Sequence, residues 1–322
     1  MRSSLLILLL GTVLPSGAVA ESGRAGAFLL GNVGARSQGL GNAVTAFSDD
    51  VTAFYGNPAL MTALDHYQVF LDATRTHPRD LSLAASIGIP FQRKTTLALG
   101  VRSFQPNGDV GRFRIGNTGD YRFFPAVLPE DDRIFEAGVA RRLFRGLSIG
   151  AAARFLDFSV EGPFYGNERY RGLHGSFGFS YNSAKLGLVL GGKIENFGTR
   201  ISGDRNVDLP LLSTIGISKG RLIHTAHYIA GSVEGVKLEG KDWTARAGIE
   251  YWWANVVGVR AGFDGLAGRF GGNPYRGRYT LGISARFRGA LFDLSYVPSR
   301  GSQRNSLLSA SFRMTFGEGR RK

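Results

Sequence analysis

The chain contains no cysteine in 322 residues, and this absence excludes two classes of exported protein. A small secreted domain held together by disulfides needs paired cysteines. A lipoprotein needs one cysteine at its cleavage site, where the lipid is attached. Neither class fits this sequence.

The chain also lacks a continuous apolar run of about 18 residues, the length that a membrane-spanning helix requires. The first twenty residues instead have the features of a signal peptide: Arg2, an apolar stretch from Leu5 to Leu10, and Ala18-Val19-Ala20 before Glu21. We therefore expect residues 1–20 to be removed on export. A protein exported in this way is either soluble or crosses a membrane as strands.

Acidic residues are scarce: 25 Asp and Glu stand against 39 Lys and Arg, which gives a net charge of +14, or about +13 after loss of Arg2. The basic residues occur at expected turns and in an expected barrel interior and do not form one patch, so nucleic acid is not an expected partner. Outer-membrane lipid and lipopolysaccharide at the rims of a barrel are the simpler partners. The 46 glycines have no G-X-Y period and are spread evenly, which excludes collagen and a flexible linker.

From residue 66 onward, apolar and polar residues alternate. In residues 306–316, for example, every second position from Leu308 to Phe316 is apolar, and Ser309, Ser311 and Arg313 lie between. Such runs are about ten residues long, the length of a tilted strand that crosses a bilayer, whereas strands of soluble sandwiches have about 5–6 residues. The polar positions are rich in Gly, Ser and Arg, as in a hydrated lumen. The pattern predicts an all-β fold, a transmembrane antiparallel β-barrel.

About fourteen strands are expected, an even number as in closed bacterial barrels. Short connections alternate with longer ones, so the short ones should be periplasmic. The least regular part is 208–235. The expected strands are 66–75, 81–91, 95–105, 133–143, 147–159, 171–182, 185–196, 208–218, 222–235, 242–253, 256–265, 279–288, 290–299 and 306–316. The expected short turns are 92–94, 142–146, 182–185, 219–221, 254–255 and 288–289, and the longer connections are 106–132, 160–170, 197–207, 236–241 and 266–278.

Aromatic residues gather near both ends of the expected strands, where rings prefer the lipid headgroup level. The inner rim holds Phe91, Phe144, Tyr181, Tyr251, Trp252, Trp253, Phe287 and Phe316. The outer rim holds Phe104, Phe158, Trp243, Phe263, Tyr279 and Tyr296.

Residues 21–65 do not alternate and contain small residues in three motifs. Gly39-x-Gly41 alone resembles half of a nucleotide-binding loop, but no strand precedes it and a third glycine is absent. Together, Gly39-Leu40-Gly41, Ala46-Phe47-Ser48-Asp49-Asp50 and Asn57-Pro58-Ala59-Leu60 resemble the N-terminal hatch of the FadL superfamily, in its PorV/PorQ-like branch. That superfamily includes long-chain fatty-acid channels and the PorV/PorQ proteins of type IX secretion. The resemblance covers nearly the whole mature chain.

The sequence divides into three regions: the signal peptide (1–20) and, as the resemblance implies, an N-terminal hatch (21–65) that plugs the barrel from the periplasmic side and the outer-membrane barrel (66–322). Pro58 restricts Asn57 to extended or turn geometry, and an asparagine at a turn caps local backbone donors. Asp49 and Asp50 are costly inside a barrel unless they are paired. We hypothesise that they dock on basic lumen residues; the alternative is that those residues pair only with lumen carboxylates. The expected basic set is Arg102, Arg142, Arg154, Lys193, Arg246, Arg260, Arg286, Arg288 and Arg313, and the acidic set is Glu136, Glu195, Glu250, Asp264 and Asp293.

Metal binding and catalysis are not expected. His224 and His227 would lie on opposite faces of a strand, and no further histidine or cysteine is close. His174 lies near Ser176, but serine is common on the polar face, and no nucleophile has a placed base. No cofactor, metal site or enzymatic activity is therefore predicted.

Two functions remain open. In the first, the protein handles other proteins, with secretion-system components or exported cargo as partners, as the PorV/PorQ-like resemblance implies. In the second, it is a FadL-like channel for passive uptake of hydrophobic small molecules such as long-chain fatty acids. Only the 106–132 connection, with its apolar stretch 123–128, is long enough to help form an apolar groove, and the expected lumen is charged. These features favour the first function.

Overall fold

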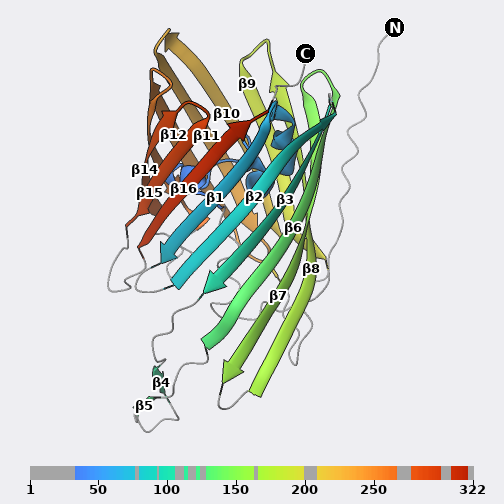
Figure 1. Ribbon diagram of the computed structural model, residues 1–322, viewed down its shortest axis with the longest axis vertical. Coiled ribbons are helices and arrows are strands. Elements are labelled where there is room, and N and C mark those ends of the chain that lie inside the picture. The colour runs from blue at the N-terminus through green and yellow to red at the C-terminus, as the bar shows by residue number, and fades with distance from the viewer. Residues whose placement is uncertain are drawn as a thin grey trace.

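The computed structural model of the chain describes most of the expected barrel and the second part of the expected hatch (Figure 1). The described residues are 33–76, 80–92, 94–105, 112–114, 121–123, 128–162, 166–198, 209–266, 277–298 and 306–317. The expected signal peptide, residues 21–32 and most of the apolar stretch 123–128 lie outside them.

Three short helices precede the strands: α1 (Ala35–Gly39), α2 (Ala53–Gly56) and the 3-10 helix η2 (Pro58–Ala63). The first barrel strands are β1 (Tyr67–Thr76), β2 (Asp80–Gln92), β3 (Thr95–Gln105), β6 (Leu128–Phe144), β7 (Leu147–Gly162), β8 (Gly166–Ser183) and β9 (Leu188–Gly198). They are followed by β10 (Leu212–His224), β11 (His227–Leu238), β12 (Trp243–Trp253), β13 (Val257–Asp264), β14 (Arg278–Phe287), β15 (Ala290–Val297) and β16 (Leu307–Phe316). A small separate hairpin consists of β4 (Arg112–Arg114) and β5 (Tyr121–Phe123).

The fourteen long strands form one closed antiparallel barrel, as the alternation predicts. Each strand pairs with its neighbours in the chain, and β1 closes the ring by pairing with β16, from Tyr67 opposite Phe316 to Thr76 opposite Leu307. The short turns lie at one end, the upper end in Figure 1, where the arrowhead of β16 also lies. Closure satisfies the backbone groups of every strand, which a structure in hydrocarbon requires.

The outer surface of the barrel is apolar. In β14, Leu281 is 59% and Ile283 is 51% exposed, while the alternate residues Thr280 and Ser284 are each 2% exposed. The same alternation leaves large apolar side chains exposed on the outside of the other long strands. A band of this kind matches a lipid environment. In the part of the chain that the structure describes, no helix has the length and hydropathy needed to cross a membrane.

Three strands are longer than the sequence pattern predicts. The strands β6, β7 and β8 continue past the other barrel strands at the end opposite the short turns (Figure 1). The expected connection 160–170 is wrong, because β7 and β8 stay paired up to Gly162 opposite Gly166. The expected connection 106–132 likewise contains the β4–β5 hairpin and the first residues of β6. In these extensions the alternation of apolar and polar residues fades while backbone pairing continues. Strands predicted from alternation therefore end too early.

The turn predicted at 219–221 is also wrong. Pairing of β10 with β11 continues through Gly220 opposite Ala230 to His224 opposite His227, and the turn is at 225–226. The glycine that suggested a turn has a different role, because a Cβ at Gly220 would lie 2.0 Å from the hydroxyl of Tyr228. The sequence argument placed His224 and His227 on one strand. In the structure, His224 ends β10 and His227 begins β11. They flank the turn, with ring centroids 6.4 Å apart.

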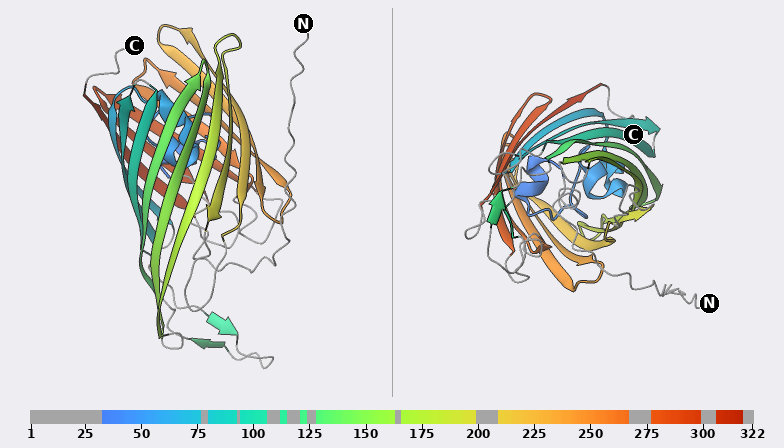
Figure 2. Two further views of the ribbon diagram at one scale, coloured as in Figure 1. Left: turned by 90° about the vertical axis from the view of Figure 1, so that its right-hand side faces the viewer. Right: turned by 90° about the horizontal axis from the view of Figure 1, so that it is seen from below.

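The N-terminal segment, which we define as residues 33–66, lies inside the barrel. Figure 2, in the view along the barrel, shows the helices α1 and α2 within the ring of strands. Its apolar side chains, such as Phe54 and Met61, form a core with inward-facing alanines of the wall, such as Ala98 and Ala140. The segment then leads directly into β1, the strand at the seam of the barrel.

Candidate functional site

A ring of inward-facing glycines receives the N-terminal segment. At these positions an added Cβ would meet atoms of the segment at 3.4 Å or less, and most would collide with it. Because glycine has no side chain, the backbone of the segment can approach the wall directly. This glycine ring consists of Gly88, Gly100, Gly138, Gly150, Gly178, Gly191, Gly248, Gly262 and Gly282.

The Gly39-x-Gly41 motif sits against the β13–β14 side of this ring. Gly41 has φ +63°, a conformation that favours glycine, and a Cβ there would lie 2.4 Å from the backbone nitrogen of Phe263. Opposite it, a Cβ at Gly262 would lie 2.2 Å from the Gly41 nitrogen. The Thr280 hydroxyl donates to the Gly39 carbonyl at 2.9 Å and accepts from the Gly41 N–H at 3.0 Å. The motif is therefore a site of close packing between backbones.

The Asn57-Pro58-Ala59 motif occupies the opposite side of the ring. Asn57 has an extended backbone before the proline, and its side chain accepts from the Ala59 N–H at 3.1 Å. Its amide nitrogen donates to the carbonyl of Thr45 at 2.7 Å and to that of Phe179 at 3.0 Å. One side chain thus begins the η2 helix and attaches it to the barrel wall.

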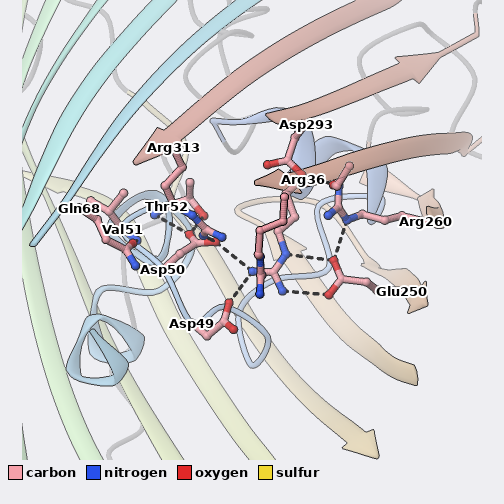
Figure 3. Close-up of polar contacts among 12 residues, drawn as sticks. Arg36, Asp49, Asp50, Val51, Thr52, Gln68, Glu250, Arg260, Asp293 and Arg313 are labelled. Atoms are coloured by element: carbon pink, nitrogen blue, oxygen red, sulfur yellow. Dashed lines mark hydrogen bonds and ion pairs between the residues drawn. The ribbon is translucent and has the colours of Figure 1, made fainter. Parts of the chain in front are cut away.

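A buried ionic network holds the segment on the short-turn side of the ring (Figure 3). The guanidinium of Arg36 makes a two-pronged contact with Glu250 on β12, with both N–O distances 3.0 Å. It also contacts Asp49 at 2.6 Å and Asp50 at 2.9 Å. Asp50 in turn pairs with Arg313 on β16. The network therefore connects the segment to two strands on different parts of the wall.

The network extends further along the wall. Arg260 on β13 contacts Glu250 at 2.6 Å and Asp293 on β15 at 2.9 Å. Each of these side chains is almost fully buried. A buried charge is costly unless it is paired, so the members of this network depend on one another.

Asp49 and Asp50 have different environments although they are adjacent. The side chain of Asp49 is 74% exposed, whereas that of Asp50 is 2% exposed. Burial raises the pKa of Asp50, but attraction to Arg313 and then to Arg36 outweighs it and holds the pKa well below its ordinary value. The Asp50 carboxylate also accepts from the Thr52 N–H at 2.8 Å. Asp50 is therefore the structural anchor of the pair.

A second charged cluster lies on the long-loop side of the glycine ring. Arg102 and Glu136 each lie two residues beyond a ring glycine and form a two-pronged contact, at 3.0 and 2.8 Å. Glu136 also contacts Arg154 at 2.8 Å. The cluster continues with Arg154 to Glu195 at 3.3 Å, Lys193 to Glu195 at 2.8 Å, and Arg246 to Asp264 at 2.9 Å.

Seven of the nine predicted basic residues fall into three groups. Carboxylates of the wall pair with Arg102, Arg154, Lys193, Arg246 and Arg260, the arrangement of the alternative hypothesis. Arg313 pairs with Asp50, the arrangement of the docking hypothesis. Arg286 instead lies 4.8 Å from the ring of Trp252 and contacts Asn255.

Three details differ from the sequence expectations. Trp252 was assigned to the aromatic rim, but it faces the interior and is 5% exposed. Arg288 was assigned to the lumen, but it is exposed in a turn with φ +46°. Arg36 was missed, although it contacts three carboxylates. The sequence did contain a signal for it: Arg36 is a cation in the same segment as the adjacent acidic residues Asp49 and Asp50, with which it could pair.

A cavity of about 1270 Å³ lies between the N-terminal segment and the short turns. We call it the short-turn cavity. Arg36, Phe47 and Asp49 of the segment line one side, and inward-facing residues at the ends of the strands line the others. Among the described residues, no group of three or more His, Asp or Glu side chains is arranged to hold a metal ion.

The comparison with solved structures supports the barrel fold. No protein-family model matches the chain, and no curated protein matches it. Among solved structures, the toluene transporter TbuX of Ralstonia pickettii has 12% identity and a TM-score of 0.60, over 90% of this chain and 100% of that one. The toluene transporter TodX of Pseudomonas putida has 13% identity and a TM-score of 0.60, over 88% and 98%. A FadL homologue of Pseudomonas aeruginosa has 11% identity and a TM-score of 0.58, over 88% and 98%.

Proposed function

We propose that this protein is an outer-membrane barrel for passive uptake of small hydrophobic compounds, with the N-terminal segment as its hatch. The similar structures support this proposal, since two of them are described as toluene transporters and one as a FadL homologue. The likeness covers nearly the full length of each of these chains. The apolar outer band supports the outer membrane as the location.

The function favoured by the sequence, protein handling in type IX secretion, receives no comparable support. It depended on a PorV/PorQ-like resemblance and on the charged lumen. Most charges of the described lumen are paired within the barrel, as are Arg102 with Glu136 and Arg246 with Asp264. A charged lumen of this kind therefore does not argue for a protein partner.

The observation that carries the proposal is how the segment is attached. It occupies the barrel interior, where polar and ionic contacts hold it beside the ring of glycines, at Asp50 to Arg313 and at Gly41 to Thr280. Such contacts have two discrete states, made or broken. A segment held in this way closes the lumen at rest and opens it when the contacts break, which is what a hatch requires.

The test combines uptake with a reversible cross-link. The hydroxyls of Thr62 on η2 and Ser148 on β7 lie 2.8 Å apart, so the variant Thr62→Cys with Ser148→Cys places two thiols within reach of a disulfide. The natural chain has no cysteine that could interfere. Uptake of labelled toluene and of a long-chain fatty acid would be measured in cells that lack the gene and carry either this variant or the unchanged chain.

We expect the unchanged chain to restore uptake of at least one compound. The oxidised double variant should lose that uptake, and a reductant should restore it, while Thr62→Cys alone stays active under both conditions. Absence of uptake with the unchanged chain would contradict the transport function. Full uptake through the oxidised, cross-linked protein would contradict the hatch.

A further inference from the structure

The short-turn cavity has an excess of positive charge. Five cationic side chains line it, and only two carboxylates do so among the described residues, Asp49 and Glu250. Both carboxylates already contact Arg36. The remaining cations are Arg142, Arg145, Lys185 and Arg286.

Arg286 on β14 is the most constrained of these cations. Its guanidinium lies 4.8 Å from the centroid of the Trp252 ring and donates to the side-chain oxygen of Asn255. No carboxylate in the described part of the chain forms an ion pair with it. The charges of Arg313 and Arg36 repel it and those of Asp49 and Glu250 attract it, but neither carboxylate forms an ion pair with it. An arginine that an aromatic ring holds in place without an ion-paired carboxylate can bind an anion.

Arg142 and Arg145 extend the positive charge to the opposite wall. Arg142 is exposed and donates to the backbone carbonyl of Thr62 at 3.0 Å, which fixes its direction without neutralising its charge. Arg145 is exposed in the β6–β7 turn at the mouth of the cavity. Together they give an anion that enters from the short-turn end a favourable field.

The cavity also has apolar and aromatic walls. Phe47 of the N-terminal segment, Tyr181, Leu222, Tyr228 and Trp252 line it. Ligand sites generally combine such walls with a small number of placed polar groups, in volumes of about 300–1,000 Å³. The short-turn cavity, at about 1270 Å³, is somewhat larger than that range, and its lining suits a molecule that has an apolar body and one negative group.

We propose that the short-turn cavity binds small organic anions, namely carboxylates on an aromatic or aliphatic body, with Arg286 as the main contact of the carboxylate and Trp252 and Phe47 beside the body. The inference deepens the proposed function, on which it rests for the source of the ligand. It adds a binding site on the short-turn side of the hatch, lined by residues that suit the carboxylate of such a ligand.

Binding can be measured on the purified barrel in a non-ionic detergent. The chain has three tryptophans, and Trp243 and Trp253 are exposed on the outer surface. In a Trp243→Phe, Trp253→Phe background, fluorescence reports Trp252 alone. Benzoate and octanoate are the probes, benzyl alcohol is the neutral analogue of benzoate, and inorganic phosphate is an anion without an apolar body. Titration calorimetry on the unchanged chain gives an independent affinity.

We expect benzoate and octanoate to change Trp252 fluorescence and to bind at least tenfold more tightly than benzyl alcohol or phosphate. Arg286→Gln should weaken benzoate binding about tenfold or more, the effect of losing a hydrogen-bonded charge. Arg286→Lys keeps the charge and should lose less. The matched control is Arg141→Gln, which removes an exposed charge that does not line the cavity. It should leave binding unchanged.

Three results would overturn the inference: equal binding of benzoate and benzyl alcohol, equal binding of benzoate and phosphate, or the same loss in Arg141→Gln as in Arg286→Gln. The heat-dependent shift of a folded barrel on gels identifies variants that fail to fold, and Arg286→Lys and Arg142→Gln then serve in their place. Uptake measurements distinguish a failure of this inference from a failure of the proposed function. Toluene uptake without benzoate binding contradicts only the cavity site, and benzoate binding without any uptake contradicts only transport.

Discussion

Asp50 and Arg313 come from opposite ends of the chain and form an ion pair inside the barrel. Asp50 belongs to the N-terminal segment and is 2% exposed, and Arg313 belongs to β16, the last strand. Arg36 contacts the same carboxylate from the other side, at 2.9 Å. The position of the segment in the lumen therefore depends on a carboxylate that has two cations and almost no water around it.

We predict that Asp50→Ala loosens the segment and Asp49→Ala does not. Removing one member of a buried pair costs about 3–5 kcal/mol, because the other charge stays buried without its counterion. An exposed pair such as that of Asp49 is worth at most about 1 kcal/mol. Ion conductance in planar bilayers should rise in Asp50→Ala and stay near that of the unchanged protein in Asp49→Ala. Equal conductance in all three proteins would show that Asp50 does not hold the segment closed.

Arg36→Ala should expose the segment to protease. This change leaves Glu250 and Asp50 without their shared cation, and both carboxylates are buried. The protein in detergent should then be cut by chymotrypsin after Phe47, Phe54 or Tyr55, which the unchanged barrel protects. Arg75→Ala, which removes an exposed arginine from β1, is the control and should stay protected. Protection of Arg36→Ala at the same protease dose would contradict the assigned role.

Gly262→Ala should destabilise the protein, and Gly231→Ala should not. A Cβ at position 262 would lie 2.2 Å from the backbone nitrogen of Gly41, whereas one at position 231 meets its nearest atom at 3.7 Å. Overpacking of this kind costs about 1–3 kcal/mol. The apparent Tm in detergent should fall in the first variant only. A similar fall in both would mean that the effect does not come from contact with the segment.

The hold of Asp50 on the N-terminal segment should be independent of pH from pH 8 to pH 5. The folded protein holds the pKa of Asp50 below its ordinary value of 3.8, so the contribution of this carboxylate to stability is complete above that value. It is lost only as the pH falls below 3.8 toward the lower pKa of the folded state. Bilayer recordings should therefore show opening in strongly acidic solution. Opening between pH 5 and pH 7 would indicate that another group controls the segment.

The barrel could be predicted from the sequence because its physical cause repeats in every strand. Each strand alternates between lipid and interior, so Leu281 and Thr280 show the same contrast as many other pairs. The prediction failed where that cause is absent. The extensions of β7 and β8 up to Gly162 and Gly166 are held by backbone pairing, which leaves no alternation in the sequence.

The site was less predictable than the wall. The motifs that contain Gly41 and Asn57 were found, but their contacts with Gly262 and Gly178 join residues far apart in the chain. Glycines that stand opposite each other in space give no local pattern. Arg36 was missed for the same reason, since its main acceptor, Glu250, is on β12.

The pairing of β1 with β16 has a consequence for biogenesis. The strand that seals the cylinder also carries Arg313, the cation that grips Asp50. A sheet that lacks β16 cannot close into a barrel, and it also lacks the arginine that pairs with Asp50. Placement of the N-terminal segment and closure of the barrel are thus coupled, and a chain truncated before β16 would have both an open sheet edge and a loosely held segment.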